Sequence, residues 1–353
     1  FDVNKKNDDW KNFPRGYFIL PECIITSQEN DTLITLIKKQ DEELSPQNMS
    51  REINNININL INQTNKVSNN TSKPDSLNYG VTKTDYVHLI NKIIDEIKSN
   101  TVQKVVLSRS KYLKFEGSFN LLKCMEQIRN YYPKCINFFI KLPDRGIFFG
   151  STPERLIKKE ESQIKSEAIA GTIQRSHNIN SDMQLEKQLK NDCKNLEEHH
   201  LVIKEIQKKL SPKLMNIKIS KSPKILKLKN IQHLISNITG ELKNDIHILE
   251  LVKIMHPTPA VSGYPVDKAL KLINKYEQHD RGWYSGPVGW VESSGNGDFC
   301  VALRSAFIQD QSIQLFSGGG IVLNSNPDKE WEETELKLKT IQEIIKDNIC
   351  YDD

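Results

Sequence analysis

The sequence lacks several patterns that mark common protein classes. None of its 353 residues lies in an apolar run near the roughly 20 that a membrane-spanning helix needs, and residues 1–30 carry no secretory-signal pattern, so no membrane insertion is expected. The motifs G-x-x-x-x-G-K-[ST], G-x-G-x-x-G and G-x-S-x-G are all missing. These absences argue against a phosphate loop, a dinucleotide-binding fold and a serine-hydrolase elbow.

Excess charge and paired cysteines are also missing. Lys and Arg number 49 and Asp and Glu 45, which leaves a net charge of only +4, and the two signs are interspersed. We therefore expect no nucleic-acid partner. The six cysteines form no C-x-x-C pair and have no short spacing to histidine. We expect them to be reduced and mostly buried, in a cytoplasmic protein.

Apolar periodicity predicts an α+β fold with extended antiparallel sheets flanked by helices. Helical spacing covers residues 82–100, 181–210 and 327–347. Strands are predicted at 104–109, 137–142, 147–150, 286–291, 299–308 and 313–317. The last three are separated by short turns that suit hairpins. Residues 41–79 are rich in Asn, Ser and Thr and are expected to be mobile.

Nine segments combine residue types that a core alone does not require. In chain order they are KVVLSR (104–109), FGSTPERL (149–156), EAIAGT (167–172), EEH (197–199), HPTPAVSG (256–263), RGWYSGPVGW (281–290), ALRSA (302–306), GGGIV (318–322) and EWEETELK (330–337). Their order and content resemble the chorismate-binding enzymes from about Tyr79 to Asp347. The resemblance implies a large two-lobed catalytic domain at residues 81–353, with a variable amino-terminal portion, residues 1–80, packing on it.

Lys104 and Glu154 are the catalytic pair that this resemblance implies. Taken alone, Lys104 reads as a strand-end lysine that reaches water, and Glu154 as an exposed turn carboxylate. In water-adding members of the family, the lysine activates the attacking water, which requires a neutral amine. The glutamate protonates the departing hydroxyl, which requires an enclosed carboxyl group with a raised pKa.

Glu198, Glu330 and Glu333 are implied as ligands of Mg²⁺. Glu330, Glu333 and Lys337 share one face of a predicted helix, so a solvated face with a Glu333–Lys337 ion pair is the plain alternative. An oxygen-only set of carboxylates suits magnesium, whereas zinc prefers nitrogen or sulfur ligands.

Chorismate, the implied substrate, is a dianion and needs two carboxylate receptors. The resemblance places its ring carboxylate near the backbone of Gly171 and Thr172, and its enolpyruvyl carboxylate at the planar fork of Arg304. Further implied substrate contacts are Ala260, Tyr284, Gly318, Gly319 and Lys337. Tyr284 can also be read as core alone, and the glycine run as a tight strand exit.

Three positions separate the reactions within the family. Ala170 stands where covalent members carry lysine, and Lys104 stands where anthranilate synthases usually carry glutamine. Ala260 stands where members that go on to eliminate pyruvate tend to carry threonine. These residues favour isochorismate synthase, with salicylate synthase as the alternative and an anthranilate synthase-like enzyme or a catalytically silent homologue after it. No amidotransferase subunit is expected, and the chain is expected to be a monomer or weak homodimer.

Overall fold

The computed structural model describes residues 10–11, 13–28, 31–37, a few positions between 45 and 54, 79–115 and 117–350. The chain divides into two compact units, one of residues 14–70 and one of residues 1–13 with 71–353. In the smaller unit, strands β1 (Cys23–Gln28) and β2 (Asp31–Leu36) form an antiparallel hairpin. The segment 41–79, expected to be mobile, lies almost entirely outside the described residues. Among the described helices, none is long and apolar enough to cross a membrane.

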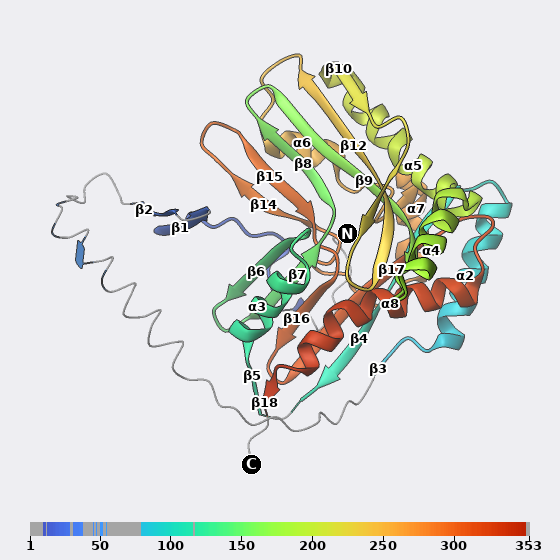
Figure 1. The fold of residues 1–353 in the computed structure, drawn as a ribbon, viewed down its shortest axis with the longest axis horizontal. Helices are drawn as coiled ribbons and strands as arrows, with labels where there is room; N and C mark the ends of the chain where they lie inside the picture. The colour runs from blue at the N-terminus through green and yellow to red at the C-terminus, as the bar shows by residue number, and fades with distance from the viewer. Residues whose placement is uncertain are drawn as a thin grey trace. The chain divides into compact units, whose positions relative to one another are not determined.

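The larger unit contains two seven-stranded antiparallel sheets, which confirms the predicted fold class (Figure 1). Sheet 1 has the order β13-β4-β17-β16-β7-β6, with β3 on β4. Its strands are β3 (Tyr79–Gly80), β4 (Lys104–Lys114), β6 (Ile136–Leu142), β7 (Gly146–Thr152), β13 (Gly263–Tyr264), β16 (Ser305–Gln309) and β17 (Ser312–Ile321).

Sheet 2 has the order β10-β12-β9-β8-β15-β14, with β11 on β12. Its strands are β8 (Arg155–Glu160), β9 (Gln163–Gln174), β10 (Leu214–Ile219), β11 (Lys224–Lys227), β12 (Ile231–Leu242), β14 (Pro287–Val291) and β15 (Gly297–Val301). A separate short pair joins β5 (Ser118–Phe119) and β18 (Ile349–Cys350).

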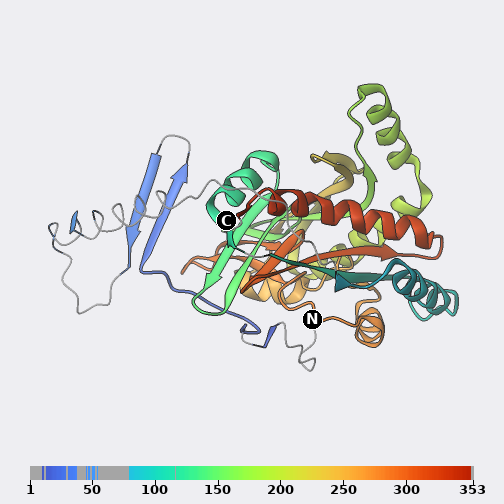
Figure 2. The same cartoon turned by 90° about the horizontal axis from the view of Figure 1, so that it is seen from below.

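Helices cover both sheets. They are α2 (Lys83–Lys98), α3 (Leu121–Tyr131), α4 (Ile179–Asn191), α5 (Cys193–Leu210), α6 (Ile248–Met255), α7 (Val266–Tyr276) and α8 (Pro327–Lys346), with a 3-10 turn at Ser211–Lys213. Helices α5 and α6 pack on sheet 2, whereas α8 lies along one face of sheet 1 (Figure 2).

The predicted helices at 82–100 and 327–347 are confirmed, because local sequence specifies both. The Thr82 side chain caps α2 by accepting from the Asp85 N–H, and the isoleucines spaced along one face of α2 are buried. Asn326 caps α8 in the same way, and Pro327 occupies the first turn, where a missing N–H costs nothing.

Two elements that were predicted to be continuous were wrong, because the structure divides each of them into two separate elements. The helix predicted over 181–210 is interrupted at Asp192, whose backbone is extended and whose side chain accepts from the Asn195 N–H to start α5. The strand predicted over 299–308 is divided between β15 in sheet 2 and β16 in sheet 1. Residues 302–304 carry the chain from one sheet to the other.

This is the second crossing along the chain, and the first crossing lies directly beside it. Strand β7 of sheet 1 passes into β8 of sheet 2 through Pro153 and Glu154. Backbone hydrogen bonds join the two crossings: the Val301 N–H donates to the Glu154 carbonyl at 3.1 Å, and the Ser151 N–H donates to the Arg304 carbonyl at 3.1 Å. Glu154 and Arg304 are therefore held side by side by the main chain.

The cysteines agree only in part with the sequence expectation. The five whose side chains are described, Cys23, Cys124, Cys135, Cys193 and Cys300, are all free thiols. Cys124 and Cys300 are buried, but Cys193 is exposed at the start of α5. Cys23 and Cys135 are only partly buried, so the prediction that the cysteines are mostly buried was wrong. Cys193 is exposed because it takes the first position of a helix whose buried face begins later.

Candidate active site

A cavity of about 680 Å³, counting its part open to solvent, lies among residues of both sheets, α5 and α8. Nine of the sequence-predicted site residues line it: Glu154, Gly171, Thr172, Glu198, Ala260, Tyr284, Arg304, Gly318 and Lys337. The other four are not among its lining residues. Lys104 adjoins Glu198, Glu330 and Glu333 lie on α8, and Gly319 faces Glu330.

Lys104 is the first residue of β4 and is completely buried, so it is not a strand-end lysine that reaches water. Its Nζ lies 3.0 Å from Glu198 Oε1 on α5. Gly320 makes room for this pair, because a Cβ at that position would lie 2.0 Å from Glu198 Oε1 and 2.8 Å from Lys104 Cε. The absence of a side chain at Gly320 thus permits a buried ion pair between the strand and the helix.

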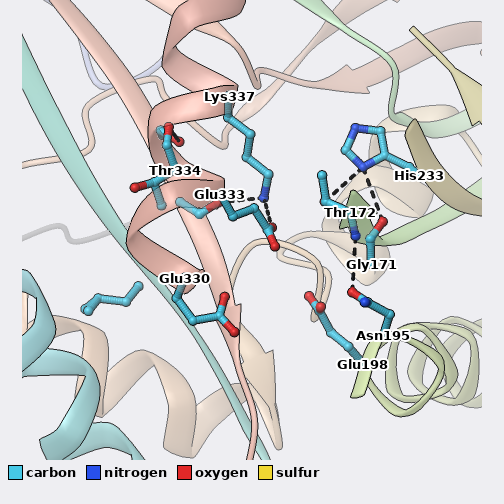
Figure 3. A network of polar contacts seen from close by, with 12 residues as sticks. Gly171, Thr172, Asn195, Glu198, His233, Glu330, Glu333, Thr334 and Lys337 are labelled. Atoms are coloured by element: carbon cyan, nitrogen blue, oxygen red, sulfur yellow. Dashed lines mark hydrogen bonds and ion pairs between the residues drawn. The ribbon is translucent and has the colours of Figure 1, made fainter. Parts of the chain in front are cut away.

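Three carboxylates and three lysines alternate around this end of the cavity. Lys194 Nζ lies 2.9 Å from Glu330 Oε1 and 3.7 Å from Glu198 Oε2. Lys337 Nζ lies 2.7 Å from Glu333 Oε1 and donates to the Gly318 carbonyl at 2.9 Å. Figure 3 shows Glu330 and Glu333 on α8 facing the side from which Glu198 points.

Burial and neighbouring charge act in opposite directions on these carboxyl groups. Burial by itself raises the pKa of Glu198, but Lys104, Lys194 and Lys337 outweigh it and lower that pKa to about 2. Burial raises the pKa of Glu330 to about 6, in spite of Lys194. Glu198 is therefore a firmly ionised carboxylate, whereas Glu330 gains or loses its proton near neutral pH.

The donor chemistry of this cluster fits magnesium. Its carboxylates supply only oxygen, and Glu330 Oε2 is buried without a hydrogen-bond partner in the described part of the chain. No group of three His, Cys, Asp or Glu side chains among the described residues is arranged to hold a metal ion. Lysines stand between the carboxylates instead, so Glu198, Glu330 and Glu333 are suitable donors that are not gathered around one point.

Glu154 lies at the first crossing between the sheets and is only 3% exposed. Burial raises the pKa of Glu154 to about 8, although the nearby Lys104 charge lowers it. The Thr258 hydroxyl donates to Glu154 Oε1 at 3.5 Å. At neutral pH the Glu154 side chain is therefore mostly a protonated carboxylic acid, and it can act as a proton donor in the cavity that it lines.

Arg304 lies at the second crossing, with a left-handed backbone φ of 46° that directs the chain into β16. Its guanidinium is buried, which lowers the pKa of Arg304, and it has no carboxylate partner among the described residues. Nη2 contacts His233 Nε2, whereas Nη1 has no hydrogen-bond partner in that part of the chain. A buried cation without a counter-ion, facing a cavity, is suited to receive an anion.

His233, on β12, was missed by the sequence analysis. Burial, together with the Arg304 charge, lowers the pKa of His233 well below its usual range, so the imidazole is neutral. Because Arg304 can only donate, His233 Nε2 accepts and the ring proton is on Nδ1. Nδ1 lies 3.0 Å from Thr172 Oγ1 and 3.3 Å from the Gly171 carbonyl (Figure 3). His233 thus connects Arg304 to the β-bulge of β9 at Gly171 and Thr172.

Asn195 and Lys194, in the first turn of α5, were missed as well. Asn195 Oδ1 accepts from the Thr172 N–H at 3.2 Å, so this N–H already has a partner. A Cβ at Gly171, whose φ is 79°, would lie 3.0 Å from Asn195 Cβ. The sequence signal for the first turn of α5, which holds Lys194 and Asn195, is its cap residue Asp192. The prediction of one continuous helix overlooked this signal.

Comparisons with known proteins agree with this geometry. The family model for chorismate-binding enzymes matches residues 1–346. The isochorismate synthase MenF of Bacillus subtilis is 36% identical over 73% of this chain and 54% of its own length. The salicylate biosynthesis isochorismate synthase of Pseudomonas aeruginosa is 35% identical over 72% of this chain and 53% of its own length. The chain spans about half the length of these curated relatives.

A solved structure gives the same result for the fold. The menaquinone-specific isochorismate synthase MenF of Escherichia coli superimposes with a TM-score of 0.73 and 30% identity, over 79% of this chain and 65% of that one. With the family model covering nearly the whole sequence, the chain belongs to the chorismate-binding enzyme family.

Proposed function

We propose that this chain is an isochorismate synthase, an isomerase that converts chorismate to isochorismate. The observation that carries the proposal is the buried Glu154 carboxyl group, which keeps its proton near neutral pH in a cavity lined also by the Arg304 guanidinium, a buried cation with no carboxylate partner among the described residues. An acid and an anion receptor side by side suit a reaction that expels a hydroxyl group from a carboxylate-bearing ring. The names of the relatives support the same activity.

The reaction is a substitution across the ring diene. Lys104, as the free amine, takes a proton from the water that attacks C2, and a C2–oxygen bond forms. The ring double bonds shift, the C4–oxygen bond breaks, and Glu154 gives its proton to the departing hydroxyl, which leaves as water. One proton is accepted and one is given, so exchange with solvent resets both residues. The base role requires Lys104, next to Glu198, to lose its proton before water attacks.

The remaining site residues bind and orient the substrate. Arg304 receives the enolpyruvyl carboxylate, with Tyr284 beside it as a neutral phenol, because burial raises the pKa of Tyr284 to about 12. Lys337 and the Gly171 backbone, which line the same cavity, receive the ring carboxylate. Glu198, Glu330 and Glu333 would hold Mg²⁺, which when bound offsets the charge of that carboxylate.

Ala260 lines the cavity and supports release of isochorismate without pyruvate elimination. The test is incubation of the chain with chorismate and MgCl₂, followed by chromatographic separation of the products. Isochorismate supports the proposal, and salicylate with pyruvate supports the alternative, salicylate synthase. Unchanged chorismate with folded protein overturns both.

We also propose residues 81–353 as the catalytic domain, because strands of both sheets and every proposed site residue lie in that range. Residues near the amino terminus contribute to the same compact unit: Trp10 stacks on Phe307 with ring centroids 4.4 Å apart. A cytoplasmic location, a monomeric or weakly dimeric state and independence from an amidotransferase remain predictions from the sequence.

A further inference from the structure

Lys194 occupies an unusual position among the charged residues of the site. It lies in the first turn of α5, and its side chain is 17% exposed. Its ammonium group is at ion-pair distance from two carboxylates on different helices, Glu198 on α5 and Glu330 on α8. Helix α5 packs on sheet 2 and α8 on sheet 1, so Lys194 connects elements of the two sheets through two of the proposed metal ligands.

The charges of this cluster balance without any added ion. Lys104, Lys194 and Lys337 offset Glu198, Glu330 and Glu333 when all six are ionised. Without Lys194, Glu198 and Glu330 would face one another as buried like charges with one fewer cation near them. Lys194 thus supplies the positive charge that lets two carboxylates from different helices lie together.

We propose that Lys194 is the resident cation of this carboxylate cluster, and that a divalent cation binds by displacing its ammonium group from Glu198 and Glu330. The inference rests on the proposed function, because it takes these carboxylates as the metal ligands. Mg²⁺ requires oxygens at about 2.0–2.1 Å in near-octahedral geometry, and an ammonium between the same oxygens prevents that approach. Metal and lysine therefore compete for the same sites.

Two consequences follow from this competition. The metal-free protein keeps α5 and α8 together, because Lys194 bridges their carboxylates. Metal binding is weaker than three carboxylates alone would give, because it must first displace a cation at 2.9 Å from Glu330. Removing the ammonium should therefore strengthen metal binding and weaken the metal-free fold at the same time. A lysine with a purely structural role would affect only the fold.

The experiment measures Mg²⁺ binding by calorimetry without substrate, and urea unfolding with and without MgCl₂. Lys194→Met removes the charge and keeps the side-chain length, and we expect it to bind Mg²⁺ at least about tenfold more tightly than wild type. Its urea midpoint should fall in EDTA and recover more on adding MgCl₂ than that of wild type. Lys194→Arg keeps the charge and should not tighten binding. Lys190→Met, which removes an exposed lysine paired with Glu186, is the matched control.

The outcomes separate this inference from the proposed function. If wild type binds Mg²⁺ and Lys194→Met binds it equally or more weakly, the displacement is refuted and the metal assignment stands. If neither protein binds Mg²⁺ while chorismate is still converted, the metal assignment fails and the inference with it. Should Lys194→Met not fold, Lys194→Arg decides, because tighter Mg²⁺ binding with the positive charge retained would contradict competition.

Discussion

Replacing Glu154 by Gln should change the pH dependence of stability by a predictable amount. The folded protein keeps the Glu154 proton up to about pH 8, whereas the unfolded chain loses it near 4.5. The contribution of Glu154 to stability is therefore fully present below pH 4.5 and is lost as the pH rises toward 8, whereas a glutamine at this position does not titrate. The difference between the two pKa values corresponds to about 5 kcal/mol at high pH and about 3 kcal/mol at pH 7.

The assay is urea unfolding followed by tryptophan fluorescence at pH 5, 7 and 9, for wild type and Glu154→Gln. The free energy of unfolding of the variant should rise relative to wild type by about 2–3 kcal/mol from pH 5 to pH 7, and by somewhat more at pH 9. Glu160→Gln is the control, because that side chain is 68% exposed and stays hydrated in both states. A difference that does not change with pH would refute the assignment of a buried, protonated Glu154.

Other substitutions test the remaining parts of the site. Lys104→Met should lower turnover at least about 100-fold while the circular dichroism spectrum stays that of wild type, and substantial residual turnover would remove Lys104 from the base role. Arg304→Lys should raise KM for chorismate about tenfold or more, because a single ammonium cannot bind a carboxylate through two parallel hydrogen bonds; an unchanged KM would contradict the anion-receptor role. Gly320→Ala should lower turnover at least about tenfold, since the new Cβ displaces Glu198 from Lys104, whereas Gly16→Ala, with no atom within 4 Å of its Cβ, should have no effect.

The elements that sequence predicted correctly are those whose burial is decided locally. The isoleucines of α2 recur with helical spacing next to a threonine cap, so periodicity and capping agree. The two broken elements have a different cause. The segments before and after Asp192 both carry an apolar stripe with helical spacing. Only the capping geometry at Asp192 separates them into α4 and α5. Residues 299–308 are apolar except for Arg304 and Ser305, and the change of sheet at residues 302–304 depends on partners elsewhere in the chain.

The candidate site shows the same division. Glu154, Glu198 and Arg304 could be predicted because they lie in motifs that resemble a known family, and the structure places all three on one cavity. His233 and Lys194 could not, because their importance comes from partners far away in sequence: Arg304 lies 71 residues from His233, and Glu330 lies on a different helix from Lys194. Periodicity and spacing carry no information about such contacts.

The two crossings between the sheets have a consequence for motion. Glu154 and Arg304 lie where the chain passes from one sheet to the other. The ion pairs of Lys104 with Glu198 and of Lys194 with Glu330 instead join elements that belong to, or pack on, different sheets. A small rotation of one sheet against the other would therefore stretch those ion pairs and leave the acid and the anion receptor at a constant separation. The crossings would then act as a hinge that carries the proton donor Glu154, while the proposed base Lys104 and the carboxylates lie on the parts that move.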